Sequence, residues 1–190
     1  MKRLITFILL ILTQITMVYG QNSLEIVIFN KVNEYRVSKG LSEIVFDSWI
    51  FEQAENHSVY CSKVGYIYHK QEIDVPGHEE LLRLGERIYR TNNYVEEKVI
   101  KCYENLALLP SLHTHNLVKK TNEEIADRVM EMWINSPTHL DILNKEGNVG
   151  ELFKGAISIE KSYNHPWEQY ENIPYIYVTL NYVKYVYNNN

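Results

Sequence analysis

The chain has 190 residues, with 24 acidic and 19 basic side chains, so its formal net charge is −5 at neutral pH. An acidic chain without a basic cluster lacks the surface that binds nucleic-acid phosphates, and we expect no nucleic-acid partner. The length suits one domain that buries its own core.

The start of the chain has the layout of a secretory signal peptide. Two basic residues precede a mainly apolar run over residues 4–12, and smallish residues lie near the end of the segment, before Gly20. The run is too short for a transmembrane anchor, which needs about 20 apolar residues. We therefore expect a signal peptide over residues 1–20, one domain over residues 21–190, and a secreted protein, extracellular or periplasmic, without a transmembrane anchor.

Two segments of the first third have helical patterns. Apolar residues recur at helical spacing over residues 23–39, and Gly40 ends that pattern. A second helix is expected from a cap at Asp47 or Ser48 to Gly65, whose freedom at positive φ suits a helix end.

Two more helices are expected in the middle of the chain. Residues 79–89 have a weak helical pattern. Thr121 and Glu124 form a capping box, in which each side chain bonds a free backbone N–H at the start of a helix. Pro137 forces the chain out of that helix.

The last third changes to strand patterns. Residues 156–159 are expected to form a short strand, and alternating apolar and polar side chains over residues 175–186 predict a longer one. Helices followed by strands favour an α+β fold, with helices covering a sheet.

The chain contains two cysteines beyond the leader, Cys61 and Cys102. In an oxidising compartment a disulfide between them is expected. Two buried free thiols, or one reactive cysteine, remain alternatives, because a thiolate needs a stabilising partner that the sequence does not reveal.

Several short phrases occur in a fixed order along the chain, whereas P-loop, GxGxxG, GxSxG and complete HExxH motifs are absent. The phrases are VNEYR at 32–36, GL at 40–41, QAENH at 53–57, YH at 68–69, ENLA at 104–107, WINSPTH at 133–139, ILN at 142–144, KGA at 154–156 and YVTLNY at 177–182. Their joint order and spacing from Leu24 to Tyr182 resemble the short bacterial-type domain of the CAP superfamily, which includes cysteine-rich secretory, antigen 5 and pathogenesis-related 1 proteins. The resemblance implies a three-layer α-β-α sandwich, with helices covering a small antiparallel sheet and a groove across one face.

The resemblance also implies a site in that groove. The matching positions are His69, His139 and Glu104, and two neutral imidazoles can hold a divalent metal such as zinc. Two histidines leave the other coordination positions to water, so the ion would be weakly bound. Glu104 would orient a histidine or a metal-bound water. Ser136 stands where eukaryotic members have a second acidic residue, and Thr138 replaces a common glycine, which weakens the expectation of metal binding.

The other histidines have simpler interpretations. His57 is expected to be a hydrogen-bonded packing residue on the second helix. His113 and His115 form an H-x-H pair in a polar loop, which is more typical of a solvated loop than of a metal site.

Three functions fit these residues. A secreted binding protein would take a small molecule, a lipid or an extracellular protein in the groove, and no catalytic residue is assigned. A metal-dependent hydrolase would use Glu104 as general base. An adhesion or host-interaction module would carry a vestigial site. The missing second acidic residue and the lack of a nucleophile motif favour binding.

Overall fold

The computed structural model describes residues 23–71, 75–76, 83–91, 97–113, 118–147, 151–165 and 172–187. The expected signal peptide over residues 1–20 lies outside these ranges. Among the helices within them, none combines the length and apolar character that a bilayer crossing requires.

A sheet of four strands forms the centre of the molecule, in the order β1-β3-β4-β2. The strands are β1 (Ile44–Phe46), β2 (Glu97–Pro110), β3 (Glu151–Ser162) and β4 (Tyr175–Tyr187). β4 pairs antiparallel with both β2 and β3. β1 runs parallel to β3, so the sheet is mixed where an antiparallel sheet was predicted.

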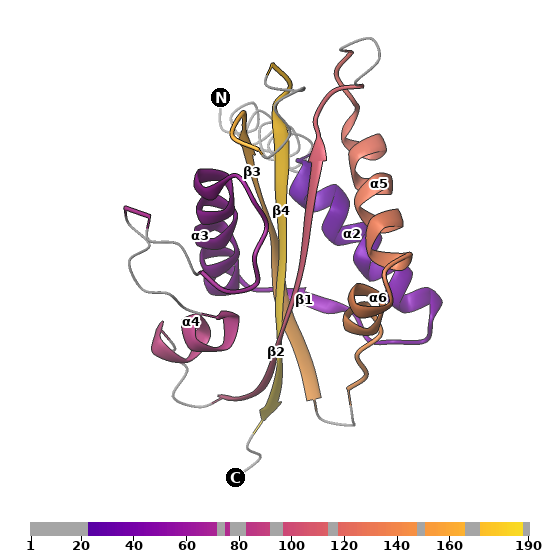
Figure 1. The fold of residues 1–190 in the computed structure, drawn as a ribbon. Coiled ribbons are helices and arrows are strands. Elements are labelled where there is room, and N and C mark those ends of the chain that lie inside the picture. Colours follow the sequence, from indigo (N-terminus) through magenta and orange to yellow (C-terminus); the bar gives the residue numbers. More distant parts are fainter. Residues whose placement is uncertain are drawn as a thin grey trace, which may run out of the picture.

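Helices cover both faces of this sheet (Figure 1). α3 (Ser48–Val64) and α4 (Leu84–Thr91) lie on one face, and α2 (Leu24–Ser38), α5 (Asn122–Ile134) and α6 (Pro137–Leu143) lie on the other. The larger apolar cluster joins the sheet to α2, α5 and α6, and two smaller clusters join it to α3 and α4. The predicted α+β fold with three layers is confirmed.

The helix ends follow their local sequence signals. Asp47 caps α3 by accepting hydrogen bonds from two backbone N–H groups, and Gly65 ends it at a φ of 81°. Thr121 and Glu124 form the expected capping box of α5. Pro137 follows the end of α5, but it also occupies the first turn of α6, where its missing N–H costs nothing. α6 was therefore not predicted.

β1 and β2 were not predicted either. β1 has only three residues. In β2, the run from Leu106 to Leu109 is buried throughout, because helices cover both faces. Its side chains therefore lack the apolar–polar alternation by which a half-exposed strand is recognised.

The VNEYR phrase holds distant elements together. The side chain of Asn33 accepts from Ile44 N (2.8 Å) and donates to Ile44 O (3.0 Å), which anchors β1. Arg36 is fully buried, and its guanidinium donates to the carbonyls of Ser42 (2.9 Å), Leu143 (2.9 Å) and Lys145 (3.1 Å). The α2 helix thereby fixes both the start of the sheet and the end of α6.

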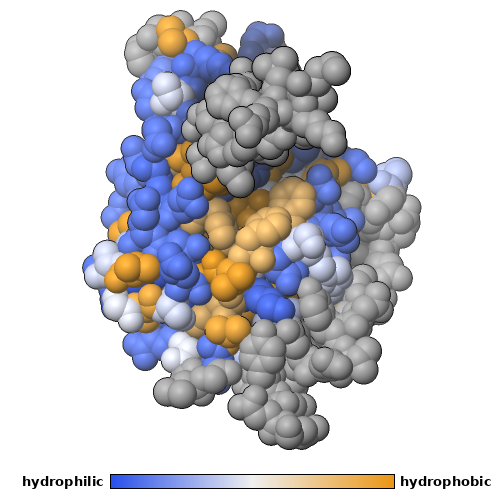
Figure 2. Space-filling model, turned by 180° about the vertical axis from the view of Figure 1, so that it is seen from behind, coloured by the Kyte–Doolittle hydropathy of each residue, from blue (hydrophilic) through white to orange (hydrophobic). Residues whose placement is uncertain are grey.

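The β1 edge of the sheet carries exposed apolar side chains. Apolar side chains gather at the centre of the face seen in Figure 2, between hydrophilic borders. On β1, Val45 and Phe46 are exposed, and the Phe46 ring packs against the rings of Phe29 and Phe51. β1 and β2 are the two ends of the strand order, so this aromatic group lies at the edge opposite to β2.

The expected disulfide is not formed: Cys61 and Cys102 are both free thiols. Cys61 lies in the apolar cluster that contains Tyr60 and Tyr177, whereas Cys102 packs against the separate cluster around Ile50. Burial raises the pKa of the Cys61 thiol to about 12 and that of Cys102 to about 11. Both thiols are therefore protonated at neutral pH, which also argues against a reactive cysteine.

Candidate functional site

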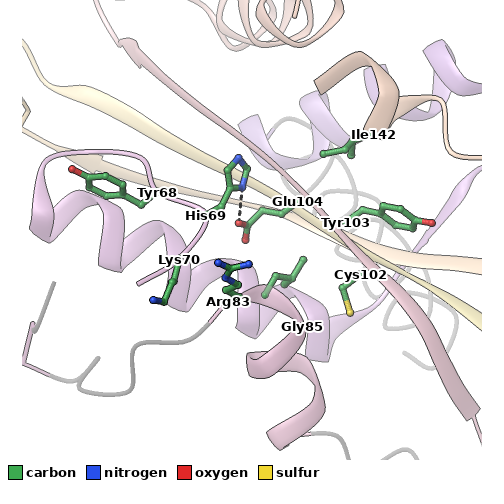
Figure 3. A pocket seen from close by; sticks show the side chains of 10 residues that line it. Tyr68, His69, Lys70, Arg83, Gly85, Cys102, Tyr103, Glu104 and Ile142 are labelled. Carbon is green, nitrogen blue, oxygen red and sulfur yellow. Dashed lines mark hydrogen bonds and ion pairs between the residues drawn. The ribbon is translucent and has the colours of Figure 1, made fainter. Parts of the chain in front are cut away.

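A pocket of about 630 Å³ opens beside β2, between the segment that follows α3 and the start of α4 (Figure 3). The segment after α3 contributes His69, α4 contributes Leu84, and β2 contributes Glu104. Ile142 of α6 lines the pocket from the other helical layer. Elements from both faces of the sheet therefore meet at this edge.

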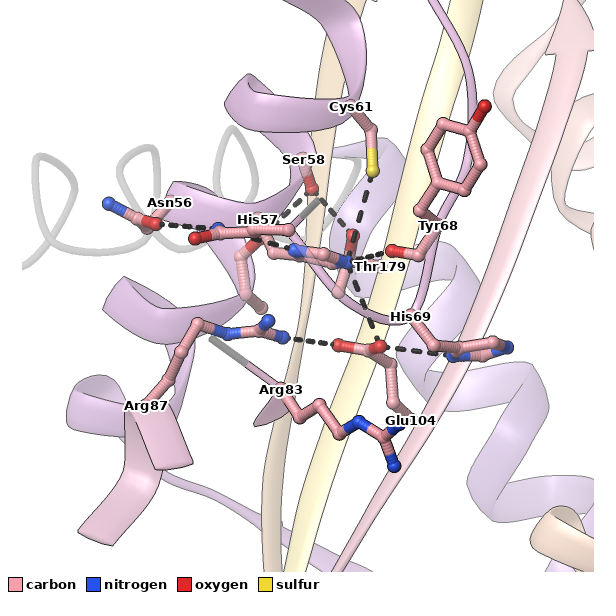
Figure 4. Close-up of polar contacts among 12 residues, drawn as sticks. Asn56, His57, Ser58, Cys61, Tyr68, His69, Arg83, Arg87, Glu104 and Thr179 are labelled. Atoms are coloured by element: carbon pink, nitrogen blue, oxygen red, sulfur yellow. Dashed lines mark hydrogen bonds and ion pairs between the residues drawn. The ribbon is translucent and has the colours of Figure 1, made fainter. Parts of the chain in front are cut away.

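The Glu104 carboxylate is the centre of the polar contacts at the pocket (Figure 4). Its side chain is 5% exposed, and Arg87 of α4 donates to Oε2 at 2.6 Å. His69 Nδ1 lies 3.0 Å from Oε1 and donates to it. In the amide orientation that satisfies both of its polar atoms, Asn181 of β4 also donates to Oε2, at 3.0 Å. A buried carboxylate is thus held by three donors from three elements.

The environment of Glu104 keeps it ionised. Burial by itself raises the pKa of this carboxyl, but the hydrogen bond from His69 and the charge of Arg87 favour the ionised form, and the pKa lies below its usual value. Arg87 is 4% exposed, so water screens the pair little. The buried negative charge is therefore compensated by a buried positive charge.

His57 is a buried neutral neighbour of this pair. Burial lowers its pKa to about 4, although the charge of Glu104 acts in the opposite direction. Its Nε2 lies 2.7 Å from the carbonyl oxygen of Tyr68, so Nε2 carries the proton and donates. Its Nδ1 then accepts from Gln71, at 3.5 Å. The predicted packing role of His57 is confirmed, and the bond to Tyr68 also positions the segment that carries His69.

The two histidines expected at the site have different surroundings. The His69 side chain is 60% exposed, and its bond to Glu104 through Nδ1 leaves Nε2 available to a ligand. His139, on α6, is half-buried, and its pKa is lowered by burial and by the charge of His69. Asn105 of β2 donates to the His139 carbonyl at 3.1 Å, which ties α6 to the strand. The structure brings His69 and Glu104 into contact and places His139 within electrostatic range of His69.

A sequence model of the cysteine-rich secretory protein family, CAP, matches residues 29–175. The chain belongs to the CAP family. Among solved structures, the CAP domain is similar to an outer surface protein from Borrelia burgdorferi, with 16% identity, a TM-score of 0.46, and coverage of 80% of this chain and 87% of that chain. A comparison with curated proteins finds no match.

Ser136 and His113 have local roles in this CAP domain. Ser136 precedes α6, and its hydroxyl lies 3.2 Å from that of Thr138. Neither Ser136 nor His139 is among the residues that line the pocket. His113 lies 3.4 Å from Glu124 at the start of α5. His115, its partner in the H-x-H pair, lies outside the described residues.

The sequence did not reveal Arg87 or Asn181 as partners of Glu104. Arg87 lies in the weakly patterned helix, and Asn181 alternates with apolar residues in β4 like any polar strand residue. A useful signal would have been that a carboxylate in an apolar strand such as β2 needs a buried cation.

Within the described ranges, no group of three or more His, Cys, Asp or Glu side chains forms a metal-binding cluster. The two oxygens of Glu104 already accept from Arg87 and His69. The remaining donors are the free Nε2 of His69 and the ring of His139. Two imidazoles supply too few ligands for a closed tetrahedral site.

Proposed function

We propose that this CAP domain is an extracellular binding protein whose pocket beside Glu104 accepts a small molecule, a lipid or part of an extracellular protein. The observation that carries the proposal is the pairing of Glu104 with Arg87 next to an open cavity of about 630 Å³. The pair holds β2 and α4 together, so the wall of the cavity is preformed, as in most ligand sites.

The same geometry favours binding over metal-dependent hydrolysis. A general base needs an accessible oxygen and an adequate proton affinity. Glu104 is almost fully buried, both its oxygens accept hydrogen bonds, and its pKa lies below the usual value. The site therefore contains a poor base, and the two thiols are protonated.

We further propose that His69 and His139 hold a divalent ion such as zinc weakly. Glu104 would keep the His69 ring oriented, as carboxylates behind metal-ligating histidines do. The lowered pKa of His139 keeps its ring neutral at neutral pH, which ligation requires. When bound, such an ion would supply a positive charge that attracts anionic or carbonyl groups of a ligand.

Secretion is the part of the proposal that rests on the first 20 residues. Their basic, apolar and small-residue order fits export, and the family that matches the chain is described as secretory. A secreted protein would meet its ligand outside the cytoplasm.

Titration calorimetry with zinc tests the ion site. We expect modest affinity for the wild type, a loss of at least about tenfold in His69→Ala and His139→Ala, and about tenfold weaker binding in Glu104→Gln. Affinity should fall below about pH 6.5, because a protonated imidazole cannot ligate. His113→Ala is the matched control and should bind as the wild type does.

Two results would contradict the ion site. Equal binding by the wild type and both histidine variants would place zinc elsewhere. No binding by any form would remove the ion from the proposal and favour an adhesion or host-interaction module with a vestigial site.

A further inference from the structure

The outer edge of β2, on the side opposite to β4, runs beside the pocket. β2 is an edge strand that pairs with β4, and its register is continuous from Lys101 to Pro110. The carbonyls of Leu106 and Pro110 accept bonds from Trp133 Nε1 (2.9 Å) and Lys120 Nζ (3.0 Å), so they point away from β4.

In an antiparallel ladder, every second residue directs both its N–H and its C=O to the same side. Glu104 and Cys102 lie two and four residues before Leu106, so their backbone groups also point away from β4. Both residues line the pocket. Across the described ranges, no group bonds the backbone N–H or C=O of either residue. Such an edge can accept a further strand.

The pocket beside this edge contains an exposed arginine. Arg83 lies in the pocket, is exposed, and its guanidinium makes no hydrogen bond or ion pair with the described residues. Lys70 lines the same pocket, and its backbone forms an isolated antiparallel β-bridge with that of Arg83. Glu104, which also lines the pocket, is paired with the buried Arg87.

We infer that the pocket binds the C-terminal end of an extended peptide, which adds to β2 as a strand through the backbone of Cys102 and Glu104 and places its terminal carboxylate on Arg83. Backbone bonds at a sheet edge give affinity, and a guanidinium is suited to bidentate recognition of a carboxylate. Tyr68, Leu84 and Ile142 line the pocket and supply apolar walls for peptide side chains. The inference rests on the pocket proposed above as the ligand site, but it does not require the ion.

Selection from random heptapeptides tests the inference. One library is displayed with free C-termini, and a matched library has blocked C-termini. Both are screened in EDTA against protein that comprises residues 21–190. Enrichment in the free-carboxylate library is expected. The selected peptide is then synthesised as the acid and as the amide, and binding is measured by fluorescence polarisation. The amide should bind about tenfold more weakly, because it lacks the charge-assisted bond.

Substitutions of pocket residues test where the peptide binds. Arg83→Gln should lower affinity for the acid by about tenfold and leave the amide unchanged. Arg128→Gln, which removes an exposed arginine of α5, is the matched control. A Cβ at Gly85 would meet no atom within 4 Å, so Gly85→Phe should fill the pocket without distorting α4 and abolish binding of both peptides. Gly85→Ala is its control.

Three results would overturn the inference: no enrichment in the free-carboxylate library, equal binding of acid and amide, or unchanged acid binding by Arg83→Gln. Zinc titration on the same preparation separates this failure from that of the proposed ion site. Zinc binding without peptide enrichment would overturn the peptide inference alone, and peptide binding without zinc would leave the pocket intact as a ligand site.

Discussion

Among the residues whose burial the structure describes, two arginines are buried, and the protein compensates their charges in different ways. Arg36 is 0% exposed and Arg87 is 4% exposed. Arg36 donates to three backbone carbonyls and lies over the Phe153 ring at 4.8 Å, with no carboxylate among its contacts in the described part of the chain. Arg87 instead forms an ion pair with Glu104.

The difference separates a region that holds the fold from the wall of the candidate site. Carbonyl dipoles do not titrate, so the surroundings of Arg36 are the same at every ordinary pH. The surroundings of Arg87 contain Glu104 and His57, which change charge with pH. A region that only holds the fold needs fixed dipoles, whereas a pocket wall built from coupled charges can respond to a ligand or a proton.

Arg36→Met breaks the structural region and should have the largest effect. It leaves three carbonyls without their donor, so we expect the free energy of unfolding to fall by about 5 kcal/mol. Urea unfolding measures the change, and the loss should be equal at pH 5 and pH 8. A loss that varies strongly with pH would show that an acidic group depends on Arg36.

Arg87→Met tests the pocket region. It leaves Glu104 buried without its cation, and the free energy of unfolding should fall by about 4 kcal/mol at pH 7. The loss should shrink at acidic pH, because the isolated carboxylate can then be protonated. Arg87→Met with Glu104→Gln should recover much of the stability. Equal losses in the single and double variants would argue against a coupled pair.

The pH dependence of the free energy of unfolding tests the role of His57 beside the Arg87–Glu104 pair. Its folded-state pKa of about 4 lies below the usual 6.5. The unfolded chain therefore binds an extra proton between these values, and stability present above pH 6.5 is lost as pH falls towards 4. We expect this histidine to cost the wild type about 3 kcal/mol at pH 4 relative to pH 7. His57→Gln, which keeps a donor for Tyr68, should have a flatter profile, and identical profiles would contradict the assignment.

Local signals were sufficient for most helix ends, for β4 and for the centre of β3. Asp47, Gly65 and the Thr121–Glu124 capping box act within a few residues, so their effect is visible in the sequence. β4 was recognised from its alternation. β2 and α6 were not, because the burial of β2 on both faces and the dual position of Pro137 depend on neighbours that the local sequence does not specify.

The candidate site also has features that the sequence predicted and features that only the tertiary structure shows. The motifs of the sequence identified the CAP fold and singled out His69 and Glu104, which the structure brings into contact. The tertiary structure alone decided that Arg87 and Asn181 hold Glu104 and that Cys61 and Cys102 stay apart. Charge compensation and thiol pairing require atoms to meet in space, and their partners lie on separate elements whose approach is determined by packing around the sheet.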